Sequence, residues 1–257
     1  MKTVEKIVYP LISAVIMICL CYIISYRVGS DLIAPAPHEV FKEFIRIVGE
    51  KGFFKRVFST LIRSFYGYVL SFAVALAFAV AAKSSAAIEK VLYPVTVVSR
   101  AIPTMSIILL CLMWLKSGTI PIVVSFAILF PMIYSQIISV LNSSDNKIKQ
   151  MMKVYKVPAA KRFFKYYLPD TTMRLYPQFV ATFSFNIKLT ISGEAMAYTL
   201  NSIGQSMKSA NMNLETANLL AWTLTAILLS FIVELVLKAL RSAVVKVKNE
   251  YRNKKTY

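Results

Sequence analysis

The chain has 257 residues, of which 57% are hydrophobic and only 16% are charged, and its net charge is +18. Soluble domains carry about 25% charged residues, so this composition excludes an ordinary soluble protein. The positive charge does not by itself indicate nucleic-acid binding, because most of the excess lies in the 142–174 loop and in the C-terminal tail. A cationic bias toward one side of a membrane explains that distribution without a nucleic-acid partner.

Six apolar stretches are long enough to cross a hydrocarbon core about 30 Å thick, and in lipid such stretches must be helices. In chain order, the predicted spans are residues 7–26, 60–82, 91–115, 120–141, 175–198 and 216–238. Lysines precede the first span and no small-residue cleavage site follows it, so we expect an uncleaved span with a cytoplasmic N-terminus. The prediction is an all-α polytopic membrane protein with one domain, residues 1–257, and a cytoplasmic C-terminus.

The external 27–59 segment contains a predicted amphipathic helix. Pro35 and Pro37 prevent the first span from continuing as a helix. Residues 38–49 then place apolar side chains at helical spacing, with charges on the opposite face. Such a helix either lies in the membrane interface or packs against the other helices.

Two predicted spans contain features that are typical of transport pathways. Pro103 removes a helical hydrogen bond and is expected to kink the third span, which exposes Thr104 beyond the kink. Charges inside a membrane are costly and often mark functional sites. Together with Pro103 and Thr104, four polar or charged residues of the fifth span are predicted to line a translocation path: Asn186, Lys188, Ser192 and Glu194.

Other roles for these charges are also consistent with the sequence. The Lys188 ammonium suits an anionic solute, but it could instead pair with Glu194 or with a backbone carbonyl, or extend toward the membrane surface. Glu194 either gates the path or holds the structure. Arg63, at the edge of the second span, is expected to reach the interface, and Glu234 is expected to pair with Lys238 four residues later.

The sequence contains few residues in patterns that are typical of a catalytic site. His38 is the only histidine, and no carboxylate cluster occurs within the spans. The phosphate-binding pattern G-x-x-x-x-G-K-[ST] is absent, so we expect neither ATP hydrolysis nor any other enzymatic activity. The sequence predicts no catalytic residue, no metal site and no cofactor.

The cationic 142–174 loop resembles the cytoplasmic loop shared by the inner-membrane permeases of bacterial ABC importers. That motif reads Glu-Ala-Ala, three residues, Gly, nine residues, Ile, one residue, Leu-Pro. In this chain its Leu-Pro falls on Leu168 and Pro169, and its Gly position falls on Lys156. Its Glu-Ala-Ala positions are occupied by Gln150, Met151 and Met152, which differ from the motif.

Further stretches between residues 35 and 240 resemble one branch of that family, the permeases for nitrate, sulfonates, taurine and related solutes. The likeness includes the external segment from Pro35 to Phe44 and the opening of the second span from Thr60 to Tyr68. It continues through the stretches Tyr93-Pro94, Arg100 to Thr104, Trp114 with Gly118, Phe130-Pro131, Gly193-Glu194 and Ser202-Ile203-Gly204.

The resemblance implies a type I ABC importer permease fold in a homodimer in the bacterial cytoplasmic membrane. It also implies a cytosolic ATPase that binds the ATP, an external or periplasmic solute-binding protein, and a small polar solute such as a sulfonate, nitrate, taurine or a vitamin precursor. The residues placed at the ATPase contact are Gln150, Met151, Met152, Tyr155, Lys156, Phe163, Leu168 and Pro169. Aromatic residues among cations are typical of interface anchors.

Two alternatives stay open at the level of sequence. The cationic loop could rest on the inner leaflet, with its lysines on lipid headgroups, instead of docking onto a protein. The chain could also be a self-contained secondary transporter or channel, whose pathway would depend on Lys188 and Glu194. That alternative leaves the long cationic loop without a role.

Overall fold

The computed structural model describes residues 2–30, 32–143, 150–152, 154–155, 157–158, 161 and 168–253. Within these residues every regular element is helical, as predicted. The helices are α1 (Lys2–Val28), α2 (Pro37–Val48), α3 (Phe53–Ser84), α4 (Ala86–Ala101), α5 (Thr104–Trp114), α6 (Ile120–Asn142), α9 (Leu168–Ala197), α10 (Ile203–Met212) and α11 (Thr216–Asn253).

Three of these helices, α3, α6 and α11, are long and apolar enough to cross a membrane. The pair α4 and α5 forms a fourth candidate that is bent by 95°. The described part of α1 contributes a shorter apolar helix, Val15–Val28, and α9 is too polar to qualify by the same criteria. The chain is therefore a multi-pass membrane protein with three or four clear spans in the described residues, and the count of six stays a prediction.

Most predicted spans coincide with helices, but several helices are longer than the spans. Helix α6 begins at residue 120 as predicted, whereas α3 begins at Phe53 and α11 continues to Asn253. These extensions contain charged residues that a hydrocarbon core excludes, so a search for apolar runs stops before the helix does. The predicted third span is two helices, because the backbone at Ile102 and Pro103 is extended.

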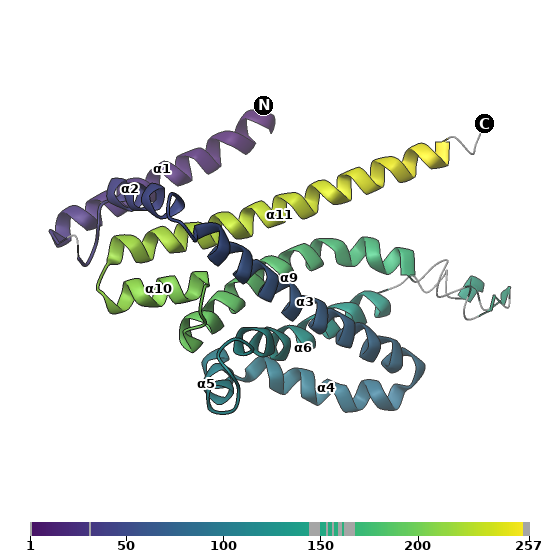
Figure 1. Ribbon diagram of the computed structural model, residues 1–257. Helices are drawn as coiled ribbons and strands as arrows, with labels where there is room; N and C mark the ends of the chain where they lie inside the picture. The colour runs from purple at the N-terminus through teal and green to yellow at the C-terminus, as the bar shows by residue number, and fades with distance from the viewer. Residues whose placement is uncertain are drawn as a thin grey trace.

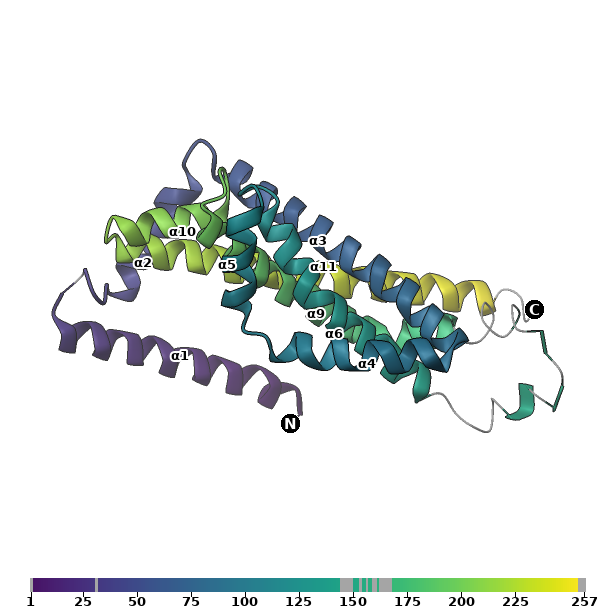
Figure 2. The same ribbon diagram turned by 90° about the horizontal axis from the view of Figure 1, so that it is seen from below.

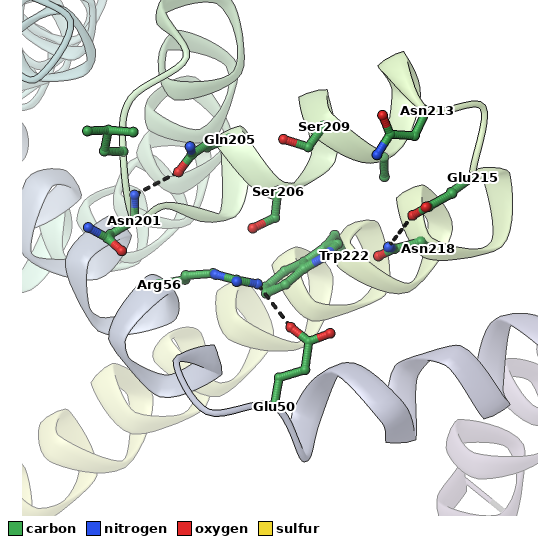
Figure 3. A pocket seen from close by; sticks show the side chains of 12 residues that line it. Glu50, Arg56, Asn201, Gln205, Ser206, Ser209, Asn213, Glu215, Asn218 and Trp222 are labelled. Carbon is green, nitrogen blue, oxygen red and sulfur yellow. Dashed lines mark hydrogen bonds and ion pairs between the residues drawn. The ribbon is translucent and has the colours of Figure 1, made fainter.

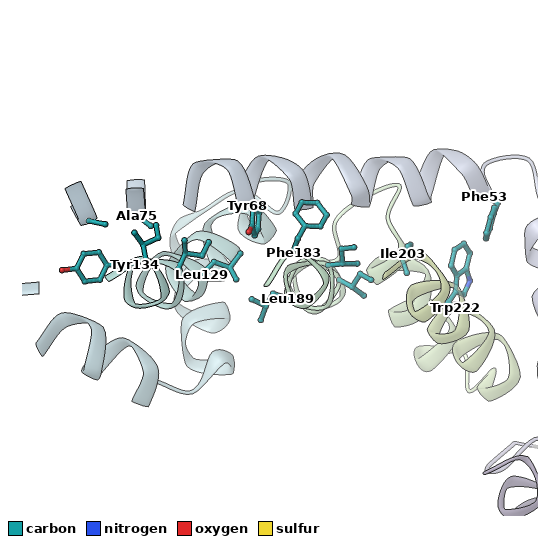
Figure 4. Packing of buried hydrophobic residues seen from close by; sticks show 14 of the residues in the cluster. Phe53, Tyr68, Ala75, Leu129, Tyr134, Phe183, Leu189, Ile203 and Trp222 are labelled. Atoms are coloured by element: carbon teal, nitrogen blue, oxygen red, sulfur yellow. The ribbon is translucent and has the colours of Figure 1, made fainter. Parts of the chain in front are cut away.

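Helix α3 is the central element of the bundle and packs against α6 and α9 (Figure 1). Its approach to α6 is close at Gly67, where an added Cβ would lie 2.8 Å from the Cβ of Ser125. Small residues permit such close contact between helices in a membrane. Figure 4 shows that one apolar core continues from α6 past Tyr68 and Phe183 to Ile203 and Trp222.

The predicted amphipathic helix exists as α2 and packs against α11. Pro37 occupies its first turn, where the missing N–H needs no helical partner. Ile47 is fully buried, whereas Phe41 and Ile45 are more than half exposed on the other side. The helix thus packs on the bundle with one face and offers apolar side chains to its surroundings with another.

Helix α1 lies apart from the rest of the bundle and meets it near α2 (Figure 2). Its described side chains are exposed almost without exception. Apolar side chains on all faces are what a helix surrounded by lipid requires. The core that positions the functional residues is therefore formed by the helices from α2 onward.

Candidate functional site

Glu194 is fully buried near the end of α9 and is surrounded by hydrogen-bond donors. Its carboxylate accepts hydrogen bonds from Thr60 Oγ1 at 2.8 Å and from Arg63 Nη1 at 3.0 Å, both on α3. The backbone N–H of Gly204, on α10, lies 3.4 Å from the same carboxylate. We refer to Thr60, Arg63, Glu194 and Gly204 as the Glu194 clamp, because these contacts join three helices.

Further hydrogen bonds from the clamp hold the connection between α9 and α10. Thr60 Oγ1 also accepts from the N–H of Ile203 at 3.1 Å, so the hydroxyl is used as both donor and acceptor. Arg63 Nη2 donates to the carbonyl of Leu200 at 3.1 Å. Arg63 thus contacts a buried carboxylate and a backbone carbonyl of its own subunit, and a guanidinium forms strong, charge-assisted hydrogen bonds with such a carboxylate.

Position 204 of the clamp requires glycine, because the neighbouring backbone leaves no room for a Cβ atom. A Cβ added to Gly204 would lie 2.5 Å from the backbone N of Ala195 and from the carbonyl of Ile191. Gly193 is similarly close to another helix, with an added Cβ 3.1 Å from the Cα of Pro121 on α6. The stretches around Gly193-Glu194 and Ser202-Ile203-Gly204, noted in the sequence, therefore meet at one packed junction.

Asn186 occupies the interface between α3 and α9. It is fully buried, and its Nδ2 donates to the carbonyl of Ser64 at 2.6 Å. A second polar contact, Ser125 Oγ to Thr190 Oγ1 at 3.2 Å, joins α6 to α9. Such contacts are suited to helix association in lipid, where polar side chains have no water to bind. Asn186 thus lies inside the subunit and not on its surface.

One exposed face runs along α9 from Gln178 to Met196. Its members recur every three or four residues, which is the spacing of a single helix face. They are Gln178, Ala181, Phe185, Lys188, Ser192 and Met196, and we call them the Lys188 stripe. Ser192 Oγ donates to the carbonyl of Lys188 at 3.0 Å. Among the residues that the structure describes, Lys188 has no ion-pair partner, and Glu194 pairs with Arg63 instead.

The six predicted path residues therefore do not share one surface. Lys188 and Ser192 lie together on the exposed stripe, whereas Asn186 and Glu194 are buried against α3. Pro103 and Thr104 lie at the bend between α4 and α5, with Pro103 exposed and Thr104 half-buried. Both arms of that bend pack against α6.

The predicted ATPase-contact residues are only partly described. Gln150, Met151 and Met152 are helical, and the N–H of Tyr155 donates to the carbonyl of Met151 at 3.0 Å. Met152 is buried, whereas the side chain of Tyr155 is 75% exposed. Leu168 and Pro169 form the start of α9. Lys156 and Phe163 lie outside the described residues.

A polar pocket of about 410 Å³ lies between α10, the start of α11 and the connection from α2 to α3 (Figure 3). The Arg56 guanidinium lies over the Trp222 ring at 5.5 Å and donates to Glu50 at 3.2 Å. Asn218 donates to Glu215 at 2.8 Å on the far side. The rest of the lining consists of Leu200, Asn201, Gln205, Ser206, Ser209, Ala210 and Asn213.

This pocket was not predicted from the sequence, because most of its polar residues lie in the segment that connects the predicted spans 175–198 and 216–238. The helical spacing of Gln205, Ser206 and Ser209 was the available signal. Likewise Thr60 appeared only within a family-like stretch and Arg63 only as a charge at the edge of the second span, with no indication that they contact Glu194. Both features depend on contacts between segments that are more than 100 residues apart.

One predicted ion pair is confirmed on α11. Lys238 Nζ lies 2.5 Å from a carboxylate oxygen of Glu234, four residues earlier on α11. Within the described residues no group of three or more histidine, cysteine, aspartate or glutamate side chains could hold a metal ion.

Residues 52–246 match the profile of one protein family, described as the inner membrane component of binding-protein-dependent transport systems. The match covers well over half of the chain and includes the Glu194 clamp, the Lys188 stripe and the segment with Tyr155. No curated protein matches the chain.

Proposed function

The chain belongs to the family of binding-protein-dependent transport system inner membrane components, and we propose that it forms half of a solute pathway in a homodimer. Members of this family are the permease subunits of ABC transporters, so the chain acts in transmembrane transport and not as an enzyme. The proposed membrane is the bacterial cytoplasmic membrane, with both termini in the cytoplasm, on the side of the cationic loop.

The observation that carries the pathway proposal is the Lys188 stripe. A lysine at the centre of a membrane helix that faces lipid costs about 2.5–3.5 kcal/mol even by the lower estimates. Lys188 lies well inside α9, is exposed in the single subunit and has no ion-pair partner among the described residues. A second copy of the chain that covers the stripe removes this cost and leaves a polar passage between the two subunits.

The proposed solute is small and polar, from the class that includes sulfonates, nitrate, taurine and vitamin precursors. The Lys188 ammonium favours an anionic group, and the Ser192 hydroxyl lies one helical turn away on the same face. Asn186 and Glu194 hold α9 against α3 from behind and are positioning residues in this proposal. The bend at Pro103 and Thr104 supplies backbone that is not helical, which transport proteins place beside cavities.

Cysteine cross-linking tests the pathway proposal. In a chain whose native cysteines are replaced by serine or alanine, Ser192→Cys is expected to form a cross-linked dimer in membranes. Ala79→Cys is the matched control, since residue 79 is small and fully buried within its own subunit. Equal cross-linking at the two positions, or none at residue 192, contradicts a stripe that faces a second copy.

Energy for transport is proposed to come from ATP bound by a separate cytosolic ATPase, which contacts the segment from Gln150 to Pro169. The exposed side chains of Met151 and Tyr155 support this proposal, because docking surfaces combine exposed apolar and aromatic groups. An external solute-binding protein delivers the solute. The chain itself then supplies the pathway and the mechanical link.

Affinity purification of the tagged chain from native membranes tests the ATPase contact. A soluble ATPase is expected to co-purify, and to be lost when Tyr155 and Phe163 are both changed to alanine. Tyr93→Ala is the control, because Tyr93 is an equally exposed tyrosine on α4. Recovery of the chain alone, together with solute uptake that needs no ATP, would replace this proposal by a self-contained secondary transporter.

A further inference from the structure

A groove of about 720 Å³ lies between α9 and α11; its lining includes Ala181 at the edge of the Lys188 stripe, but neither Lys188 nor any residue of the Glu194 clamp. Its α9 wall is mostly apolar and its α11 wall is polar and charged. The residues that line it are Met173, Tyr176, Pro177, Val180 and Ala181 on α9, and Glu234, Lys238, Arg241 and Ser242 on α11. The groove therefore combines an apolar surface with a cationic rim.

The rim is held in place by contacts between the two helices. The Tyr176 hydroxyl donates to the carbonyl of Leu237, which fixes the ring against α11. The Arg241 guanidinium lies over that ring, 5.1 Å from its centroid. Such a cation–π contact orients the guanidinium without neutralising its charge.

The two cations of the rim are not equivalent. Lys238 is neutralised by Glu234 at 2.5 Å. Among the residues that the structure describes, Arg241 has no acidic partner. Arg241 thus gives the groove a net positive charge and presents several N–H donors in a planar arrangement that matches a phosphate group.

The position of the rim along α11 is that of the membrane boundary. The predicted sixth span, residues 216–238, ends at Lys238, and Arg241 follows one helical turn later as the sequence of α11 becomes cationic. Because α9 and α11 pack side by side, Pro177, Val180 and Ala181 extend the groove from the rim toward the apolar side. Pro177 has no N–H, so the carbonyl of Met173 lacks its usual helical partner on this wall.

We propose that this groove binds one anionic glycerophospholipid. The phosphate contacts Arg241 and the Ser242 hydroxyl, and one acyl chain lies along Pro177 and Val180. Basic pockets between membrane helices at the headgroup level are suited to anionic lipids, because charge and apolar contact act on the same molecule. The proposal requires only that the chain spans a membrane, so it does not depend on the identity of the solute or of the ATPase.

Native mass spectrometry of the full-length chain, with any subunits that co-purify, tests the proposal. The probes are phosphatidylglycerol and phosphatidylcholine with identical acyl chains, and glycerol 3-phosphate as the soluble headgroup. The wild-type chain is expected to bind phosphatidylglycerol about fivefold more tightly than phosphatidylcholine. Arg241→Gln is expected to abolish this preference, whereas Lys90→Gln, which removes an exposed cation from α4, is expected to retain it.

Two further measurements keep the test decisive if Arg241→Gln does not fold. Arg241→Lys retains the charge and is expected to keep part of the preference for phosphatidylglycerol. Met173→Ala removes apolar surface from the wall at an exposed position outside the Lys188 stripe, and is expected to weaken the binding of both lipids while their ratio stays the same.

Three outcomes overturn the proposal. The first is equal affinity of the wild-type chain for the two lipids. The second is an unchanged preference in Arg241→Gln. The third is displacement of phosphatidylglycerol by glycerol 3-phosphate at a similar concentration, which would identify a site for a soluble phosphate compound and not for a lipid.

Discussion

Helix α9 carries two opposite charges six residues apart, Lys188 and Glu194, which differ in burial and in the partners they contact. Glu194 is fully buried and receives hydrogen bonds from Thr60, Arg63 and the backbone of Gly204. Lys188 is exposed and has no ion-pair partner among the described residues. The comparison shows that a charge in a membrane helix can hold one subunit together or be left for another surface, according to the face it occupies.

The helix geometry explains this difference. Six residues at 3.6 residues per turn rotate the chain by about 240° beyond one full turn. Glu194 therefore faces α3 and α10, where donors are available, while Lys188 belongs to the exposed stripe. If this contrast is real, variants of the Glu194 clamp change folding, and variants of the Lys188 stripe change transport.

The largest effect is expected for Glu194→Ala. Removal of one partner from a buried ion pair leaves an uncompensated charge on Arg63 and is expected to lower the free energy of unfolding by about 3 kcal/mol. Thermal unfolding of the purified chain in detergent, together with its yield from membranes, measures this. Glu39→Ala on α2, which removes a carboxylate without a hydrogen-bond partner among the described residues, is the control and should change stability by less than about 0.5 kcal/mol. Equal stability of the two variants would show that the clamp is not structural.

A somewhat smaller effect is expected for Gly204→Ala. The added Cβ meets backbone atoms of α9 at 2.5 Å and forces α10 away from the Glu194 clamp. Overpacking of this kind costs about 1–3 kcal/mol. The same unfolding measurement applies, with Gly118→Ala as the control, because a Cβ at Gly118 has no neighbour within 4 Å. An unchanged unfolding temperature in Gly204→Ala would mean that α10 does not contact α9 this closely.

The opposite pattern is expected for Lys188→Gln. Its stability should stay within about 0.5 kcal/mol of the wild type, because the side chain is exposed. Solute uptake should fall about tenfold, equivalent to about 1.4 kcal/mol of lost stabilisation in the rate-limiting step. Uptake into membrane vesicles that contain the whole transporter measures this, with Lys90→Gln, which removes an exposed cation from α4, as the control. Loss of stability without loss of uptake would remove the contrast between the two charges.

The smallest effect is expected for a charge outside the membrane, Glu43 on α2. Arg46 donates to this carboxylate at 2.9 Å, and that hydrogen bond lowers the pKa of Glu43 below its ordinary value of 4.5. A lowered pKa in the folded state adds stability that is present above pH 4.5 and is lost as the pH falls through the folded pKa. Arg46 is largely exposed, so the gain is below about 1 kcal/mol.

Unfolding measured between pH 3 and pH 7 checks this prediction. Glu43→Gln is expected to reduce the loss of stability on acidification, and the two chains should converge at the acidic end. Lys42→Gln, at an exposed neighbouring position, should keep the wild-type profile. A profile in Glu43→Gln that matches the wild type would show that the pair with Arg46 contributes nothing.

Much of the fold followed from local sequence. Apolar runs predicted the positions of α3, α6 and α11, and the proline pair with helical periodicity predicted α2. The break at Pro103 was also expected, since a missing N–H acts on its own helix. The 95° angle between α4 and α5 was not predictable, because it depends on how both helices pack on α6.

The candidate site was predicted less completely. Lys188, Ser192, Asn186 and Glu194 stood out as polar residues in an apolar span, but the sequence assigned all four to one path. Helical spacing alone separates Lys188 from Glu194, whereas the burial of Asn186 depends on the approach of α3. The donors of Glu194 could not be identified, because Thr60 and Arg63 are more than 130 residues away in the chain.

The sequence by itself determined that this protein is a helical membrane protein with a cationic loop, because length, apolarity and charge are local properties of the chain. The residues that resemble known permeases were also visible at that level. Only the tertiary structure decided which intramembrane charge is neutralised and which is exposed, and it alone assembled the Arg241 groove. Ion pairs and grooves arise between helices, and their free energies depend on distances that no single segment encodes.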